Sequence, residues 1–458
     1  MGVYNTLNIA RTGIKAAAYG IEVTGQNVTN ASTEGYVRRR VDQKPRAPTR
    51  TATGVFLGQG VRVESIQRSI DRNVTSRTLE ATGQEAQSRT AYQSLQVLEA
   101  SFREGDLAGL ADRFDAFFDS LQELTLEPSD HGLRQAVVAS GEDLATAVSR
   151  TAQATDETIR QIESRIESEI DGINNILEKI EFLNRQISNS DAVTGPADLL
   201  DQRDALSTNI AEKLGVTVEY KDNGQVNLWV GGHAIVQDVN VRELSVSGTA
   251  GSIDVKMSVD DGEVTVTSSL GGELGGLVKA RNMADTTSSA LDTFAQDFVD
   301  TFNGQHALGF DRTSASGGDF FTYSAGGAAS SLKVDSSLAA DPDLIAAAAS
   351  PSAEVGDGAN LSELIAIESS KLFDGGTKTS RDFIAGIYSD LGSEVRGFGV
   401  DADTQRIAVS DLTSLKDAVS AVDLDEEAVN LIKYQASYEA AARVVSISDQ
   451  LLDVLMRI

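Results

Sequence analysis

Apolar residues recur every seven positions at both ends of this 458-residue chain. Near the N-terminus the repeat consists of Leu7, Ile14, Ile21 and Val28, and near the C-terminus of Leu424, Leu431, Tyr438, Val445 and Leu452. Three residues after members of each repeat come second sets, which are Ala10, Ala17 and Thr24 in the first and Tyr434, Ala441, Ser448 and Leu455 in the second. This spacing is typical of helices that pack as coiled coils.

Both apolar stripes are narrow, so each helix would be marginally stable alone. The simplest prediction is that the N- and C-terminal helices pair with each other. The candidate interface residues are Leu7, Ile14, Ile21, Val28, Leu424, Leu431, Tyr434, Tyr438, Val445, Leu452 and Leu455.

The charge of the two ends favours the same pairing. Residues 1–50 hold eight Lys or Arg and three Asp or Glu, whereas residues 411–458 hold four and nine. Opposite charges attract and disfavour pairing of like ends. The whole chain has a net charge of −29, which argues against nucleic acid as a partner because phosphates are bound by Lys and Arg.

The middle of the chain predicts long helices interrupted by one β region. Isoleucines and leucines spaced by three and four run from Ile159 to Ile187, with Glu169 in place of one apolar residue. They indicate a long helix, with Ser129 or Asp130 as its N-terminal cap. Further helices are expected over about 66–103, 106–126, 274–304, 361–397 and 402 to the end, with 37–63 extended or loop. Pro196 and Gly215 bound another helix.

Two β-hairpins are predicted between residues 216 and 272, because alternating apolar residues flank turns at 222–224 and 260–262. The fold class is therefore mainly α with a smaller β-rich insertion. Four units are expected: a terminal coiled-coil core (1–36 with 411–458), a helical domain (37–215 with 273–308 and 361–410), the β-rich subdomain (216–272) and a loosely built Gly/Ser/Ala-rich insertion of uncertain fold (309–360).

Catalytic and cofactor chemistry finds little support. The chain has no cysteine and three histidines, His131, His233 and His306, none with a second histidine three or four residues away, so no metal site or cofactor is expected. The glycines at 271–276 lack the spacing of a phosphate-binding loop. No stretch of about 18 apolar residues exists to span a membrane, and the N-terminus lacks the apolar core of a cleavable signal.

The terminal segments and several internal ones resemble the flagellar axial proteins. The resemblance is carried by residues 7–14, 26–36, 199–204, 275–277, 302–303, 306–309 and 424–443. The terminal motifs are shared by rod, hook and hook-associated proteins, and the internal ones are similar to the hook-associated protein 1 family.

The resemblance implies a structural subunit, not an enzyme, that polymerises in a helical ring at the hook–filament junction. It also implies type III export to the cell exterior, contacts with hook protein and hook-associated protein 3, and a cytoplasmic export chaperone at the C-terminal helix. The alternatives are another axial protein, such as hook protein or hook-associated protein 3, a secreted hydrolase with its enzymatic insertion at 309–360, and a coiled-coil adhesin.

Overall fold

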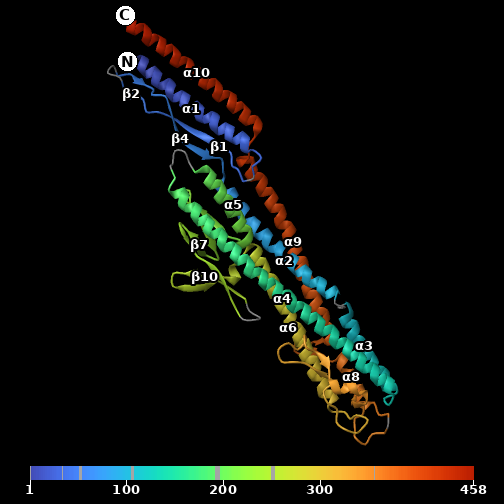
Figure 1. The fold of residues 1–458 in the computed structure, drawn as a ribbon. Helices are drawn as coiled ribbons and strands as arrows, with labels where there is room; N and C mark the ends of the chain where they lie inside the picture. Colours follow the sequence, from blue (N-terminus) through green and yellow to red (C-terminus); the bar gives the residue numbers. More distant parts are fainter. Residues whose placement is uncertain are drawn as a thin grey trace.

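The chain forms a long rod of helices with both termini at one end (Figure 1). The computed structural model describes residues 2–33, 35–50, 54–104, 108–190, 196–248, 253–354 and 356–457. At that end α1 (Gly2–Asn30) packs along α10 (Leu424–Arg457). The predicted pairing of the terminal helices is confirmed, as is the mainly α fold class.

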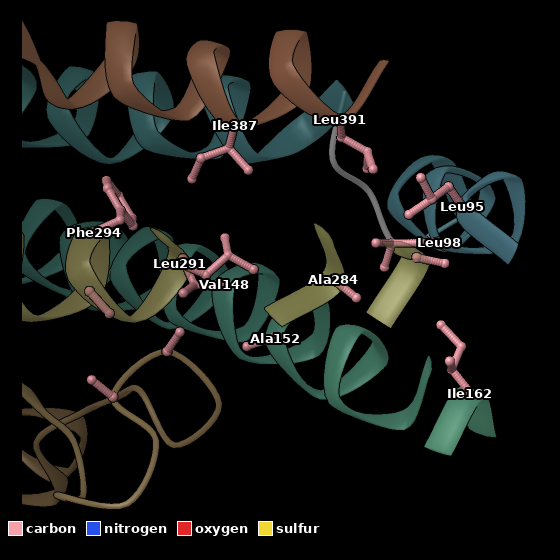
Figure 2. Close-up of a cluster of buried hydrophobic side chains, with 14 of the residues drawn as sticks. Leu95, Leu98, Val148, Ala152, Ile162, Ala284, Leu291, Phe294, Ile387 and Leu391 are labelled. Carbon is pink, nitrogen blue, oxygen red and sulfur yellow. The ribbon is translucent and has the colours of Figure 1, made fainter. Parts of the chain in front are cut away.

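The body of the rod is a bundle whose helices share one core. It contains α2 (Arg72–Glu104), α3 (Ala108–Leu126), α4 (His131–Ser188), α5 (Ala197–Leu214), α6 (Gly272–His306), α8 (Ala359–Ser369) and α9 (Ser380–Ser420). Figure 2 shows labelled side chains of this core, among them Leu95 of α2, Ile162 of α4, Leu291 of α6 and Ile387 of α9.

The longest element, α4, is 58 residues long and starts where the sequence indicates. Asp130 caps it, because its side chain accepts a hydrogen bond from the Leu133 amide at 2.9 Å. One detail of the predicted seam is wrong. Ile170 is buried in the seam, while Glu169 lies beside it and binds Lys213 of α5 at 2.6 Å, so no apolar position is missing.

Both predicted hairpins of the β region are confirmed. β5 (Thr217–Tyr220) pairs with β6 (Val226–Val230), and β10 (Asp254–Val259) pairs with β11 (Gly262–Thr265). β7 (His233–Gln237) and β8 (Asn240–Val241) complete a four-stranded antiparallel sheet, and β9 (Leu244–Ser247) completes a three-stranded one. The turn η1 (Thr267–Ser269) leads into α6.

The segment expected to be extended or loop forms a β-hairpin against α1. β1 (Arg39–Pro45) pairs antiparallel with β4 (Val61–Arg68), and the short strands β2 (Thr49–Arg50) and β3 (Phe56–Leu57) pair at its tip. The helix expected from about residue 66 begins at Arg72 instead, because β4 continues to Arg68.

The region 309–360 is packed into the core, which contradicts the expectation of a loosely built insertion. It contains β12 (Phe321–Thr322), β13 (Lys333–Val334), α7 (Ser336–Ala340) and the turn η2 (Pro342–Leu344). Phe320 and Phe321 are fully buried and contact the rings of Phe117 and Phe302 at centroid distances of 5.3–5.6 Å. Aromatic residues are scarce in the chain as a whole. They are concentrated in this region, which lies at the end of the rod opposite the two termini.

The C-terminal helices break at positions that differ from the prediction. A hairpin of β14 (Lys371–Phe373) and β15 (Lys378–Thr379) separates α8 from α9, and α9 continues to Ser420. Thr379 and Asp382 form a capping box at the start of α9, and Asp423 accepts hydrogen bonds from the amides of residues 425 and 426 at the start of α10. Within the described ranges, no helix has the length and apolarity to cross a membrane.

Candidate assembly interface

Three contacts define how α1 and α10 pack. Asn27 donates a hydrogen bond to Glu427 at 3.0 Å, the ring of Tyr434 covers Gly20, and Ala441 faces Gly13. The contacts step by seven residues forward along α1 and seven backward along α10, so the helices are antiparallel in a single register. Close packing depends on glycine here, because a Cβ built on Gly20 would lie 2.5 Å from the Tyr434 ring.

The predicted interface residues fall into three groups. Leu7, Ile14, Ile21, Leu431, Tyr434, Val445 and Leu452 are partly buried. Val28, Leu424 and Tyr438 are 43%, 55% and 41% exposed, and the side chain of Leu455 lies outside the described residues.

Small residues of the second set on α1 are more buried than the large apolar residues of the repeat. Ala10, Ala17 and Thr24, which the repeat places three residues after the large apolar residues, are 3–4% exposed. The helices therefore approach closely, and the larger residues flank their contact.

A buried polar cluster joins α1, β1 and α10 near the end of their contact. Asn27, 1% exposed, donates to Glu427 and to the Arg39 carbonyl, and accepts from the Arg39 amide and the Tyr36 hydroxyl, all at 2.9–3.0 Å. Arg38 donates to both carboxylates of Glu426 and Glu427 at 2.7–2.8 Å. Every hydrogen-bonding position of the Asn27 amide is satisfied.

The pKa values in this cluster reflect burial and its partners. Burial alone lowers the pKa of Arg38, but hydrogen bonds to Glu426 and Glu427 outweigh that effect and the net shift is upward. Burial raises the pKa of the Tyr36 hydroxyl. Arg38 therefore stays charged across the physiological pH range.

Two arginines, Arg39 and Arg68, connect this cluster to carboxylates of α5. Arg39 binds Asp198 and Asp201 at 2.5 and 2.8 Å, and Arg68 binds Asp201 and Asp204 at 2.8 and 2.6 Å. Burial raises the pKa of Asp201, although both arginines oppose that shift. These ion pairs link the paired terminal helices to the helical body through charge-assisted hydrogen bonds.

The charge expectation holds at one place only. Arg38 makes ion pairs with Glu426 and Glu427, and among the described residues no other ion pair joins 1–50 to 411–458. Most of the positive charge lies in 38–50 rather than on α1, where Arg11 and Lys15 are the basic residues. Attraction between the ends is thus local to the buried cluster.

α10 carries a second apolar stripe that faces solvent, here called the outer stripe. Its members are between 38% and 66% exposed and are Val429, Ile432, Val444, Ile447, Leu451 and Val454. At 3.6 residues per turn, the outer stripe lies about 150° around the helix from the residues that face α1. One side of α10 is therefore covered by α1 and an apolar opposite side is left uncovered.

The repeat alone did not identify several important residues. Gly13, Gly20 and Asn27 lie one position before Ile14, Ile21 and Val28, and the regular spacing of small residues at seven is the signal that could have found them. Arg38 and Glu427 could not be found this way, because their pairing depends on the course of β1.

The histidines do not form a site. His306 is buried, with its Nδ1 2.7 Å from the Gly318 carbonyl oxygen and its Nε2 accepting a hydrogen bond from the Ala346 amide at 3.0 Å. The ring therefore links the end of α6 to two segments of the 309–360 region. Burial lowers the pKa of His306. Within the described part of the chain, no group of three or more His, Cys, Asp or Glu side chains could hold a metal ion.

Two family models match parts of the chain, and they point to a flagellar axial protein. The model described as the flagellar hook-associated protein FlgK helical domain matches residues 95–321, and the one described as the flagellar basal body rod FlgEFG protein C-terminal matches residues 418–458. The second match covers α10 and the end of α9.

Whole-length relatives narrow this class. Flagellar hook-associated protein 1 of Bacillus subtilis strain 168 is 30% identical over 98% of this chain and 96% of the relative, and that of Escherichia coli K12 is 26% identical over 99% of both. The chain belongs to the flagellar hook-associated protein 1 family.

A solved structure shares the fold. The flagellar hook junction protein FlgK from Burkholderia pseudomallei matches with a TM-score of 0.67 and 16% identity, over 75% of this chain and all of that one.

Proposed function

We propose that this chain is a structural subunit of the bacterial flagellum that polymerises at the hook–filament junction through its paired terminal helices. The observation that carries the proposal is the outer stripe. A helix that buries one apolar side and exposes another has a surface for a neighbour.

The neighbour is a second copy of the chain in a helical ring. In this arrangement each subunit presents its outer stripe and accepts that of its neighbour on a different surface. Such a heterologous contact repeats around a ring or along a helix. Hook protein and hook-associated protein 3 would contact the two faces of the ring, and an export chaperone would cover α10 before assembly.

The terminal core (1–36 with 411–458) supplies the polymerising part in this proposal. The helical domain, the β-rich subdomain and the packed 309–360 region form the outer parts. The chain acts outside the cell and has no enzymatic role. A peptidase and glycosidase assay of the purified protein is expected to show no turnover.

The experiment places a charge in the outer stripe. Ile447→Asp and Leu451→Asp should leave the monomer folded, because both side chains are at least half exposed, and should abolish incorporation into flagella, because a carboxylate is costly to bury unpaired. Incorporation is measured by immunogold labelling of the hook tip and by swimming in a strain that lacks its own copy.

The matched control is Leu126→Asp at the end of α3, which is 81% exposed and far from the terminal helices. It should incorporate normally. Normal filament attachment by the two outer-stripe variants would show that the contact between subunits lies elsewhere.

A further inference from the structure

The seam between α1 and α10 contains a repeat that could fit in more than one register. Along α1, Thr6, Gly13, Gly20 and Asn27 are spaced by seven, and along α10, Glu427, Tyr434, Ala441 and Ser448 are spaced by seven. A slide by one heptad, about 10 Å at a rise of 1.5 Å per residue, presents the same faces again.

The tightest steric contact does not select one register. Tyr434 needs a residue without a side chain beneath its ring, and Gly20 provides one. Gly13 lies one heptad away and also lacks a side chain. A slide that moves Tyr434 from Gly20 to Gly13 is therefore permitted by this contact.

Chain connection does not forbid the slide either. Residues 421–423 link α9 to α10. If the first six residues of α10 unwound, the link would lengthen by about 10 Å, since an extended residue advances about 3.3 Å and a helical one 1.5 Å.

The polar cluster does discriminate between the registers. In the observed one, Glu427 is 2% exposed and meets Arg38 and Asn27. After the slide, Glu426 and Glu427 would lie in the unwound link, so the buried Arg38 and Asn27 would lose the carboxylates that they bind. Leaving a buried charge without its partner is strongly unfavourable.

We propose that Asn27, Arg38 and Glu427 are positioning residues that fix the register of α10 against α1. A single buried polar contact has this role in coiled coils, where it selects one alignment among several of similar packing. The inference rests on the proposed function only in its consequence: the register fixes where the outer stripe sits on the subunit, so every copy presents it at the same height.

The test uses disulfide formation, which is clean because the chain has no cysteine. Ala441→Cys is combined with Gly13→Cys to report the observed register, in which a Cβ at residue 13 lies 3.5 Å from that of Ala441, within disulfide reach. Ala441→Cys with Thr6→Cys reports the register displaced by one heptad. Both pairs are oxidised in the full-length purified protein.

The expected result is a preference for the 13–441 disulfide of about a hundredfold or more, which the combination Asn27→Leu with Glu427→Leu reduces to within about tenfold. The leucines keep the seam packed, and Arg38 retains Glu426. Ile21→Ala serves as the control: it weakens packing but leaves the cluster, so the 13–441 product should decrease and the 6–441 product should stay at background.

Two results would overturn the inference. If the leucine variant keeps its full preference, other contacts fix the register. If it loses both disulfides, the cluster holds the helices together without selecting their alignment. Incorporation into flagella is scored separately, so a parent protein that forms the 13–441 disulfide but does not assemble contradicts the proposed function and leaves the register inference standing.

Discussion

At the scale of single residues, Gly20 determines how close the two terminal helices come. A Cβ at this position would meet the Tyr434 ring at 2.5–2.6 Å, whereas nothing lies within 4 Å of a Cβ at Gly25 on the same helix. The two glycines therefore separate the effect of a close contact from the effect of helix propensity.

We expect Gly20→Ala to weaken the pairing of α1 with α10 by about 1–3 kcal/mol, since overpacking forces the helices apart. Gly25→Ala should be neutral or stabilise by up to about 1 kcal/mol, because alanine favours helix. Hydrogen exchange of α1 and α10 peptides measures both. Adding Tyr434→Ala should restore protection to Gly20→Ala, and equal protection in the two single variants would contradict this account.

His306 makes the free energy of unfolding of the protein depend on pH. Its folded-state pKa is lowered by burial from an ordinary value of 6.5, so the unfolded chain takes up a proton at a pH where the folded chain does not. The stabilisation from neutral His306 is therefore complete above about pH 6.5 and is lost as pH falls toward the folded pKa, at up to about 1.4 kcal/mol per pH unit.

Urea unfolding at pH 7.5 and pH 5 measures this dependence. The difference in unfolding free energy between the parent protein and His306→Gln should narrow at the lower pH. His233→Gln, at the exposed first residue of β7, provides the comparison and should leave the pH dependence of the parent unchanged. A constant difference for His306→Gln would mean that other groups dominate.

At the scale of elements, periodic patterns predicted the helices and the tight hairpins well. The spacing within α4 and the turns at 222–224 and 260–262 are local signals, so no distant partner is needed to read them. An error of one position arose at Glu169 and Ile170, because helical steps of three and four from Ile166 reach both positions.

Elements with distant partners were harder to predict. β1 begins with Arg39 and Arg40, and Arg39 is buried by its ion pairs with α5. A buried charged residue breaks the alternation of apolar and polar residues by which a strand is recognised in the sequence. Its partner β4 follows only after β2 and β3. The packing of 309–360 was missed for a related reason, since Phe320 and Phe321 are adjacent in sequence and their partners are on α3 and α6.

The interface itself was predicted in outline. The heptads predicted which helices pair, but Val28 and Leu424 are exposed, whereas the polar residues Asn27 and Glu427 beside them are buried. A hydrophobic repeat favours apolar contacts throughout, and the polar exceptions depend on Arg38, which reaches the seam from outside either helix.

At the scale of the whole molecule, the terminal pair is an appendage on an independently packed body. The main core cluster consists of residues between Leu79 and Val395. Deletion of residues 424–458 should therefore leave the body helical and soluble, while α1 loses its partner and its protection.

Circular dichroism and hydrogen exchange of the truncated protein test this expectation. Exchange should accelerate in α1 peptides and stay slow in α4 and α6, and the truncated chain should fail to incorporate into flagella. Loss of protection throughout the body would show that α10 supports the whole fold.

The contact between Asn27 and Glu427 joins residues 400 positions apart, and this separation sets an order in time. While a ribosome is still adding the last helix, α1 has no α10 to bind. Closing so long a loop is also the slowest kind of contact for a chain to make. The terminal pair therefore closes last, and α1 stays without its partner until synthesis of the chain is complete.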